Sequence, residues 1–405
     1  MNIVLVTVTY PPEIRAISLM MQELARELAG AGHRVTVVTS WPSMHVAEGV
    51  RPASLPAASE EMGVKCIRVR NLPGYKRSFI IRGISQLLMP GLFTRAIRKQ
   101  VKERIDWVIV YSPPLPLALV GKKLKRLCGC RFMLNIQDIF PQNAVDLGIL
   151  KAGALIRYFE KMEAQAYAAG DVLTAHTESS VRFLIERKGV AASKIHFIPN
   201  WIDTESFVAH EGAPDYRAAY GLQNAFVFLF SGVMGPSQDL DFILDLAKRV
   251  RDFPAIRFLF VGDGSEKKRL IARASEENIA NVIFKPYVDT RTYPGLVNSA
   301  ADVGLVVLSM KNRTPVVPGK ILGFMAAGKP VLAFLHKESD AHGLIRSAGC
   351  GLSATSADVA TAAALVKQMY EQKSKLADWG NGGRAYVRQH FGKAAVLKSL
   401  VKLLE

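Results

Sequence analysis

Residues 316–333 read VVPGKILGFMAAGKPVLA, a run that predicts a tight turn, a short helix and then a buried strand. Gly319 lets the backbone approach a ligand closely. Backbone N–H groups in the first turn of a helix, together with the helix dipole, favour an anion such as a diphosphate. Lys320 adds a positive charge at the same end. The stretch therefore indicates an α/β unit that carries a site for a phosphorylated ligand.

Strands and helices alternate along the rest of the chain. Residues 3–8 form a β-branched run, residues 17–29 have helical spacing, and residues 35–39 form a second strand. Such a βαβ start is the signature of a doubly wound parallel sheet. A second series begins at residues 226–230, after a polar linker. Further strands are expected at residues 107–111, 132–136, 172–175, 195–198, 256–261, 282–284, 303–307 and 330–334, and further helices at residues 117–127, 154–169, 179–188, 240–250, 374–389 and 394–403.

This pattern places the chain in the α/β class, with two Rossmann-like doubly wound domains facing each other across a cleft. A cleft of this kind is a favoured place for a ligand. We assign residues 1–200 to the first domain and residues 201–384 to the second. We expect the C-terminal helix, at about residues 385–405, to pack back on the first domain.

The formal net charge is +17, and much of the excess lies in the first half of the chain. Between Lys65 and Arg104 the only acidic residue is Glu103. A charge excess of this kind attracts anionic partners. We expect no nucleic acid, because no known binding module is recognised and aromatic residues are not interleaved with the basic ones.

The segment from Lys65 to Arg104 instead predicts peripheral association with an anionic membrane, since basic and apolar residues together favour a membrane surface. A solvated basic face is the alternative. The apolar residues are Phe79, Ile80, Ile81, Leu87, Leu88, Met89, Leu92 and Phe93.

The chain shows no sign of a signal peptide, a membrane span or a metal site. Residues 1–10 lack a basic leader, and the most apolar stretch, residues 79–93, contains Arg82 and is broken at Pro90 and Gly91. The four cysteines are Cys66, Cys128, Cys130 and Cys350. No histidine or further cysteine lies near Cys128 and Cys130, so we expect reduced thiols in a cytoplasmic protein with no metal.

Several shorter motifs occur in a fixed order: YPPEI at residues 10–14, ELAREL at 23–28, GHRVTVVT at 32–39, IPNWID at 198–203 and VGDG at 261–264. Together with residues 316–333 they resemble the GT-B glycosyltransferases, in particular the retaining enzymes of family 4, over nearly the whole chain. The resemblance is strongest to the bacterial O-antigen and capsule branch, which includes enzymes assigned as L-fucosamine transferases.

The resemblance implies a glycosyltransferase that works in cell-surface polysaccharide synthesis without a cofactor or a metal. Its donor would be a nucleotide sugar, most readily UDP-linked, and an N-acetylated amino sugar is one option. Its acceptor would be a lipid-linked saccharide at the inner face of the bacterial cytoplasmic membrane. A nucleotide-sugar 2-epimerase of the same fold and a catalytically degenerate scaffold protein are the alternatives.

The resemblance also implies where the donor binds. A loop with Gly232 and Gly235 would lie against the diphosphate, the base would stack beside the turn after residues 282–284, and the VGDG turn would lie nearby. Asp263 in that turn is more often structural than a direct ligand. The implied donor-binding residues are Gly232, Gly235, Gly262, Asp263, Pro286, Tyr287, Val288, Val317, Pro318, Gly319, Lys320 and Ile321, with Arg15, Lys311 and Arg313 as candidate phosphate contacts.

Two departures from the family pattern affect the donor site. The family usually has a basic pair shortly after the second loop glycine, whereas this chain has Pro236, Ser237, Gln238 and Asp239. The family also usually has paired glutamates at the positions of Pro315 and Gly323. We therefore name no ribose-binding carboxylate, and Lys320, Lys311 or Arg313 would have to supply the missing charge.

Asp138 and Lys320 are the candidate catalytic residues. Asp138 follows the strand at residues 132–136 and is the nearest ionisable group to its end. A carboxylate there could orient the acceptor hydroxyl or stabilise a cationic sugar in the transition state; a helix cap is the alternative. Lys320 would neutralise the leaving diphosphate. We expect His176 and His196 to be structural.

Overall fold

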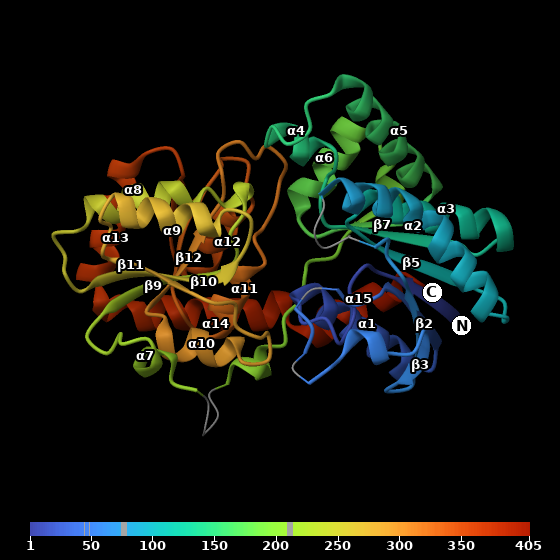
Figure 1. Cartoon of the computed structure of the whole chain (residues 1–405), viewed down its shortest axis with the longest axis horizontal. Coiled ribbons are helices and arrows are strands. Elements are labelled where there is room, and N and C mark those ends of the chain that lie inside the picture. Colours follow the sequence, from blue (N-terminus) through green and yellow to red (C-terminus); the bar gives the residue numbers. More distant parts are fainter. Residues whose placement is uncertain (44, 48, 74–78, 209–213) are drawn as a thin grey trace. The chain divides into compact units, whose positions relative to one another are not determined.

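The computed structural model describes residues 1–43, 45–47, 49–73, 79–208 and 214–405. The chain divides into two compact units, the first made of Met1–Pro199 with Leu397–Glu405 and the second of Asn200–Val396 (Figure 1). The sequence placed the returning helix at about residues 385–405, but residues 385–396 group with the second unit. The returning segment is anchored in the first unit by Trp107, whose Nε1 donates to the Leu404 oxygen at 3.0 Å.

The first unit is built on a sheet with strand order β3-β4-β2-β1-β5-β6-β7-β8. Only β3 is antiparallel, to β4, among the described strands. Parallel strands buried on both faces read as continuous apolar runs, which explains why the sequence shows them clearly. The strands are β1 Asn2–Val6, β2 Arg34–Ser40, β3 Ala58–Glu61, β4 Val64–Val69, β5 Trp107–Ser112, β6 Arg131–Ile136, β7 Val172–Ala175 and β8 Ile195–Phe197.

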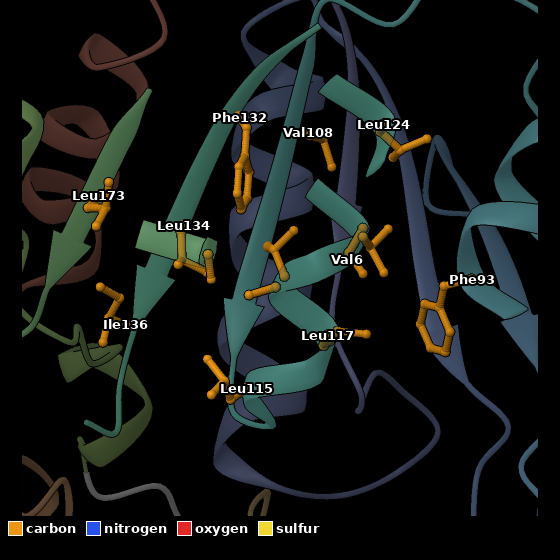
Figure 2. Packing of buried hydrophobic residues seen from close by; sticks show 14 of the residues in the cluster. Val6, Phe93, Val108, Leu115, Leu117, Leu124, Phe132, Leu134, Ile136 and Leu173 are labelled. Carbon is orange, nitrogen blue, oxygen red and sulfur yellow. The ribbon is translucent and has the colours of Figure 1, made fainter. Parts of the chain in front are cut away.

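Helices pack on this sheet around one apolar core. Figure 2 shows side chains of β6, such as Phe132, packed with Leu117 and Leu124 of α3. Gly121 permits the close approach, because a Cβ there would lie 2.2 Å from the Phe132 ring. The helices are α1 Ala16–Gly30, α2 Phe79–Gln100, α3 Leu115–Cys128, α4 Gln142–Asp146, α5 Gly153–Ala169 and α6 Glu178–Lys188.

Helix α2 corrects two expectations from the sequence. It runs unbroken for 22 residues through Pro90, and Thr94 Oγ1 donates to the Pro90 oxygen at 2.6 Å. Met89 and Phe93, expected to contact a membrane, are instead buried in the core of the first unit. In the part of the chain that the structure describes, no helix has both the length and the apolarity needed to cross a bilayer.

The second unit is built on a fully parallel sheet with strand order β11-β10-β9-β12-β13-β14. This order reverses direction beside β9, and ligands of open α/β sheets bind at such a switch point, beyond the carboxyl ends of the strands. The strands are β9 Phe226–Val233, β10 Ile256–Asp263, β11 Val282–Lys285, β12 Val303–Val307, β13 Val331–Leu335 and β14 Gly351–Thr355. Both units confirm the prediction of two Rossmann-like doubly wound domains.

Two apolar cores lie on the two faces of the second sheet, because successive strand residues point to opposite faces. Helices complete both cores: α7 Tyr216–Ala219, α8 Leu240–Arg249, α9 Lys267–Glu276, α10 Tyr293–Ala300, α11 Lys320–Ala326, α12 Ala341–Ala348, α13 Val359–Glu371 and α14 Leu376–Phe391. The last helix, α15 Lys393–Lys402, belongs to the first unit from Leu397 onward. Short 3₁₀ turns lie at η1 Pro52–Ser54, η2 Ala192–Lys194, η3 Thr204–Phe207, η4 Pro236–Gln238 and η5 Lys373–Lys375.

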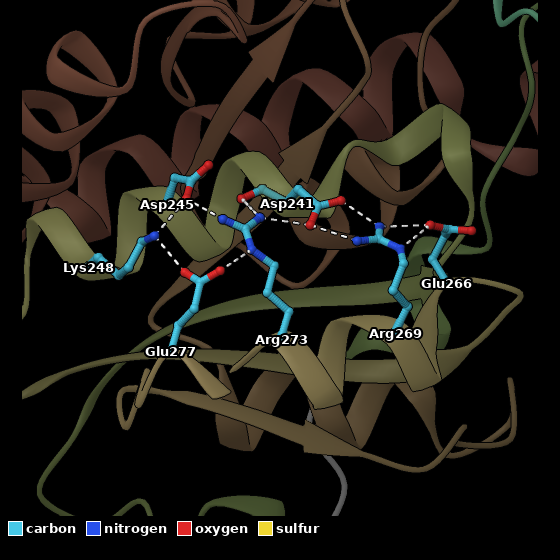
Figure 3. A network of polar contacts seen from close by, with 7 residues as sticks. All are labelled: Asp241, Asp245, Lys248, Glu266, Arg269, Arg273 and Glu277. Carbon is cyan, nitrogen blue, oxygen red and sulfur yellow. Dashed lines mark hydrogen bonds and ion pairs between the residues drawn. The ribbon is translucent and has the colours of Figure 1, made fainter. Parts of the chain in front are cut away.

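A surface network of ion pairs joins α8 to α9 (Figure 3). Arg273 of α9 lies at its centre and bonds to Asp241, Asp245 and Glu277. Arg269 extends the network by bonding to Asp241 and Glu266. Helix α9 was not expected from the sequence, and this network shows how a polar helix with few buried residues is held in place.

Candidate functional site

The structure brings Lys320 onto the glycine loop at the carboxyl end of β9. Gly232 has a φ of 134°, and a Cβ added there would lie 3.7 Å from both Cε and Nζ of Lys320. The Lys320 Nζ donates to Gln238 Oε1 at 2.5 Å, across 82 residues of sequence. The same nitrogen lies 3.8 Å from the centre of the Phe230 ring. The two stretches that the sequence assigned to the diphosphate therefore meet at one point of the second unit.

Lys320 has no carboxylate partner within the described parts of the chain. The Lys320 side chain as a whole is half-buried, but its amine is surrounded by protein atoms. This burial lowers the pKa of Lys320 to about 7. Near neutral pH the amine is thus close to its midpoint, and a bound anion would favour its charged form.

The N-terminus of α11 contributes less than the sequence suggested. The helix has only seven residues, and the N–H groups of Ile321 and Leu322 already donate to the oxygens of Pro318 and Gly319 at 3.0 and 3.2 Å. Gly319 has an ordinary φ of −57° with open space beyond its Cα. The positive charge of this site therefore rests on the Lys320 side chain rather than on the helix terminus.

Glycines let the carboxyl ends of β9 and β10, and the turns that follow them, approach closely. A Cβ on Gly262 would lie 1.9 Å from the Gly232 oxygen, and a Cβ on Gly264 would lie 2.2 Å from the Met234 oxygen. Asp263 Oδ1 accepts from the Gly264 N–H at 2.8 Å, so this carboxylate holds its own turn. Side chains at either glycine would push the two loops apart.

Lys267 is a site contact that the sequence did not reveal. Its Nζ donates to the Gly262 oxygen at 2.7 Å and to the Lys285 oxygen at 3.1 Å. It therefore ties the end of β10 to the end of β11, immediately before the expected base-binding turn. In that turn Pro286 is exposed, whereas Tyr287 and Val288 are half-buried.

Tyr293 fills the space at Gly323, the position where a glutamate is usual. A Cβ on Gly323 would lie 2.9 Å from the Tyr293 Oη and 3.0 Å from its Cε1. The Ser231 hydroxyl donates to the Tyr293 Oη at 3.3 Å. Burial raises the pKa of Tyr293 to about 12, so this hydroxyl stays protonated. The tyrosine gives a physical reason why no glutamate fits there.

The loop after β12 is fixed to the turn after β9. Both the Ser309 N–H and the Asn312 side-chain amide donate to the Ser237 oxygen, at 2.9 and 3.2 Å. Lys311 and Arg313 on this loop are exposed. Burial, and then the charge of Asp241, raises the pKa of Asp239, and the charge of Lys311 opposes this rise. No bond of the described residues links either cation to the Gly232 loop.

The remaining candidates lie in the first unit, at the carboxyl ends of its strands. Asp138 is exposed, yet desolvation by the surrounding protein raises the pKa of its carboxyl. Its charge also contributes to the raised pKa of the buried Tyr111 hydroxyl. Pro141 occupies the N-cap of α4, and no side chain caps this helix, so Asp138 is not its cap. Arg15 is half-buried, at the N-cap position of α1.

The cysteines and histidines do not form a metal site in the described residues, which contain no group of three or more potential ligands. Burial raises the pKa of Cys66, Cys130 and Cys350 to about 12 in each case. His176 is buried and His196 is half-buried.

Comparisons with known proteins relate this chain to glycosyltransferases. The family model described as Glycosyltransferase Family 4 matches residues 17–206, and the model described as Glycosyl transferases group 1 matches residues 213–386. A curated relative is the "Putative colanic acid biosynthesis glycosyl transferase WcaI" of Escherichia coli (strain K12). It is 29% identical over 341 residues, which cover 81% of this chain and 82% of that protein.

Two solved structures share the fold. Sucrose-phosphate synthase from Thermosynechococcus elongatus has a TM-score of 0.78 at 18% identity, covering 100% of this chain and 98% of that one. Anabaena HepE, solved in complex with UDP-glucose, has a TM-score of 0.71 at 17% identity, covering 100% of this chain and 99% of that one.

Proposed function

Because the chain is a glycosyltransferase with the GT-B fold, matched in its two halves by glycosyltransferase family models, we propose that it uses a UDP-linked sugar as donor. The acceptor that we propose is a lipid-linked saccharide, in the synthesis of a bacterial cell-surface polysaccharide. The name of the Escherichia coli relative supports the pathway, and the UDP-glucose complex of Anabaena HepE supports the nucleotide. An N-acetylated amino sugar, with L-fucosamine among the options, is the donor sugar to test first.

One observation carries this proposal: the contact of Lys320 with the Gly232 loop and Gln238. During transfer the bond between the anomeric carbon and the diphosphate oxygen breaks, and the acceptor oxygen bonds to that carbon as its hydroxyl proton passes to an oxygen of the leaving diphosphate. Negative charge grows on the diphosphate. A cation placed there stabilises the transition state more than the ground state. We propose that Lys320 takes this role without a metal and that the configuration of the sugar is retained.

Asp138 is our candidate on the acceptor side. It follows the end of β6 in the first unit, and its raised pKa indicates a carboxyl in a partly desolvated place. A carboxylate can orient an acceptor hydroxyl by accepting its hydrogen bond. We propose this role for Asp138, and we propose no direct sugar contact for the buried His176.

We further propose peripheral attachment to the inner face of the cytoplasmic membrane through α2. Ile84, Leu87, Leu88 and Leu92 are each between 38% and 48% exposed and recur with helical spacing. Exposed apolar groups of this size, on a face that continues into basic residues, suit an anionic bilayer. The basic residues of the face are Arg95, Arg98 and Lys99.

Fewer residues between Lys65 and Arg104 are available to a membrane than the sequence indicated. Arg68 is buried and bonds to Glu61, and Lys65 donates to the Gln100 oxygen, so both have partners inside the first unit. Lys76 and Arg77 lie outside the described residues. The proposal therefore rests on the exposed face of α2.

Isothermal titration of the full chain with UDP, GDP, ADP and TDP tests the donor assignment. We expect UDP to bind most tightly. The titration with UDP is repeated with the variant Lys320→Ala. The variant Lys268→Ala, which removes an exposed lysine of α9, is its matched control. No heat at millimolar UDP, with another nucleotide binding well, would overturn the proposal. Interconversion of UDP-sugars without any acceptor would instead indicate a 2-epimerase.

A further inference from the structure

Gln238 occupies the place where a charged residue was expected. It ends the turn η4 after Gly235, in the stretch that lacks a basic pair. Its carboxamide oxygen accepts the hydrogen bond from Lys320 at 2.5 Å. A neutral amide in this position can orient the ammonium group without cancelling its charge.

The turn that carries Gln238 is held firmly. The Gln238 N–H donates to the Gly235 oxygen at 3.0 Å, and the loop after β12 bonds twice to the Ser237 oxygen. The Gln238 side-chain amide nitrogen donates to the Ser237 hydroxyl at 3.4 Å, which leaves the oxygen facing Lys320. A fixed acceptor on a fixed turn defines where the amine can lie.

No acidic side chain of the described residues is paired with the Lys320 amine. Burial is the one cause of the low pKa of Lys320, and no described charged group contributes to it. The remaining contact is the face of the Phe230 ring, which attracts a cation but holds no proton. The ionisable groups on the adjoining loops are Asp239 beside Gln238, Lys311 and Arg313 after β12, and Asp263 and Lys267 after β10.

We propose that Gln238 is a positioning residue, which holds the Lys320 amine over the Gly232 loop. Because Gln238 adds no negative charge of its own, the amine gains a proton when a nucleoside diphosphate binds. This inference rests on the proposed function, because the diphosphate is the anion that completes the site. The proton comes from the buffer, and the amine becomes the ammonium ion that faces the diphosphate.

The expected pH dependence follows from linkage. In the empty site the amine has a pKa of about 7, and a bound diphosphate raises it. The affinity for UDP is therefore greatest below pH 7 and falls as the pH rises above it. At pH 8 the amine of the empty site is therefore mostly neutral, and the binding of UDP takes up protons, by the linkage relation. The phosphate groups of UDP are fully ionised there, since their second pKa is about 6.

The first experiment needs no nucleotide. The full chain is labelled with ¹³C-lysine, the Lys320 signal is assigned with Lys320→Arg, and its pKa is measured by NMR in Gln238→Glu, Gln238→Met and wild type. Glutamate should raise this pKa, because it adds an opposite charge beside the amine, and methionine should lower it, because it removes the acceptor. The control is Gln223→Met, at an exposed residue outside the site. An unchanged pKa in both Gln238 variants would overturn the pairing.

The second experiment counts protons. Titration of UDP at pH 8, in buffers of different ionisation enthalpy, should show net proton uptake in wild type. Gln238→Glu should bind UDP about tenfold more weakly with little uptake, and Gln238→Met about tenfold more weakly with uptake retained, as loss of a charge-assisted bond predicts. UDP binding without proton uptake would contradict this inference but leave the proposed function standing. Absence of UDP binding would contradict the proposed function, while the NMR result would still decide whether Gln238 is paired with Lys320.

Discussion

At the scale of single residues, an amine buried among neutral groups responds to an added charge more strongly than a surface amine. Lys320 is such an amine, with an amide, an aromatic face and a glycine loop around it. Its surroundings make it sensitive to the growing charge of a leaving diphosphate. Because this charge grows only as the sugar leaves, Lys320 is expected to contribute more to sugar transfer than to UDP binding.

Lys320→Ala should therefore slow sugar transfer more than it weakens UDP binding. Losing one preorganised charge-assisted contact typically costs about 10² to 10³ in rate. Steady-state kinetics and UDP titration on the same preparation measure both effects, with Lys268→Ala as control. If Lys320→Ala behaves as wild type in both assays, the diphosphate is held elsewhere.

Asp138→Asn should act on the other step. The amide keeps the size of the side chain but loses the charge that orients an acceptor, so transfer should fall while UDP affinity stays near normal. Because the pKa of Asp138 is raised, the wild-type rate should decrease as the pH falls through that raised value, and the variant should lack this limb. Transfer by Asp138→Asn at the wild-type rate would remove Asp138 from the mechanism.

The sequence predicted only part of this residue-scale picture. Lys320 and Gly232 belong to recognisable local runs, and the structure brings them together. Gln238, Lys267 and Tyr293 carry no local signal, because each acts on a loop far away in sequence. Contacts of this kind depend on which strands become neighbours in the sheet.

At the scale of elements, the glycines of α14 have a low helix propensity but serve the packing of this helix. A Cβ on Gly380 would lie 2.0 Å from the Gly328 oxygen, and Arg384 donates to the Ala327 oxygen at 2.9 Å. The helix gives up local propensity for a close approach to the end of α11. Helix α2 similarly continues through a proline that the sequence suggested would break it.

Gly380→Ala should destabilise the protein even though alanine favours helices. The added methyl group meets backbone rather than a flexible side chain, and overpacking of this kind costs about 1–3 kcal/mol. Thermal unfolding should show a lower Tm. The control is Gly343→Ala in α12, where a Cβ meets open space. A Tm at or above that of wild type in Gly380→Ala would contradict the packing.

The network between α8 and α9 predicts a salt- and acid-sensitive contribution to stability. Arg273→Ala should cost about 1 kcal/mol at low salt and less at high salt, because partly exposed ion pairs are screened. Hydrogen bonding from Arg269, and then from Arg273, holds the pKa of Asp241 below its usual value. The contribution is therefore present above pH 4, by linkage, and is lost as the pH falls through the lowered pKa.

Chemical denaturation as a function of salt and pH checks this second element-scale prediction. Arg251→Ala, at an exposed residue outside the network, serves as control. Equal losses of stability for Arg273→Ala at low and high salt would show that packing, rather than charge, is what the arginine supplies.

At the scale of the whole molecule, the alternation of buried strands and amphipathic helices was enough to predict both doubly wound domains. The pattern works because strands buried on both faces must be apolar throughout. It missed β14, whose residues are half-buried or exposed, and α9, whose surface is held by charge. Other elements were missed as well, among them the strand β4 and the helices α2, α10, α12 and α13. The net charge of +17 is a property of the whole chain and predicts an anionic partner, but only side-chain exposure shows which basic residues can meet it.

Vesicle flotation of the full chain should therefore depend on both the apolar and the basic part of α2. Wild type should float with vesicles that contain anionic lipid and remain largely unbound with neutral ones, since each basic residue near an anionic surface contributes about 1 kcal/mol. The variant Leu87→Ser with Leu88→Ser removes apolar contacts, and the variant Arg95→Glu with Arg98→Glu reverses charge. Both should reduce flotation.

The matched controls for α2 lie in the second unit: Ile271→Ser for an exposed apolar residue and Arg251→Glu for an exposed basic one. If the controls lose flotation as much as the α2 variants do, the attraction belongs to the total charge rather than to this face. If wild type stays unbound with both vesicle types, the exposed leucines of α2 do not meet a bilayer. A lipid-linked acceptor would then have to reach the protein in another way.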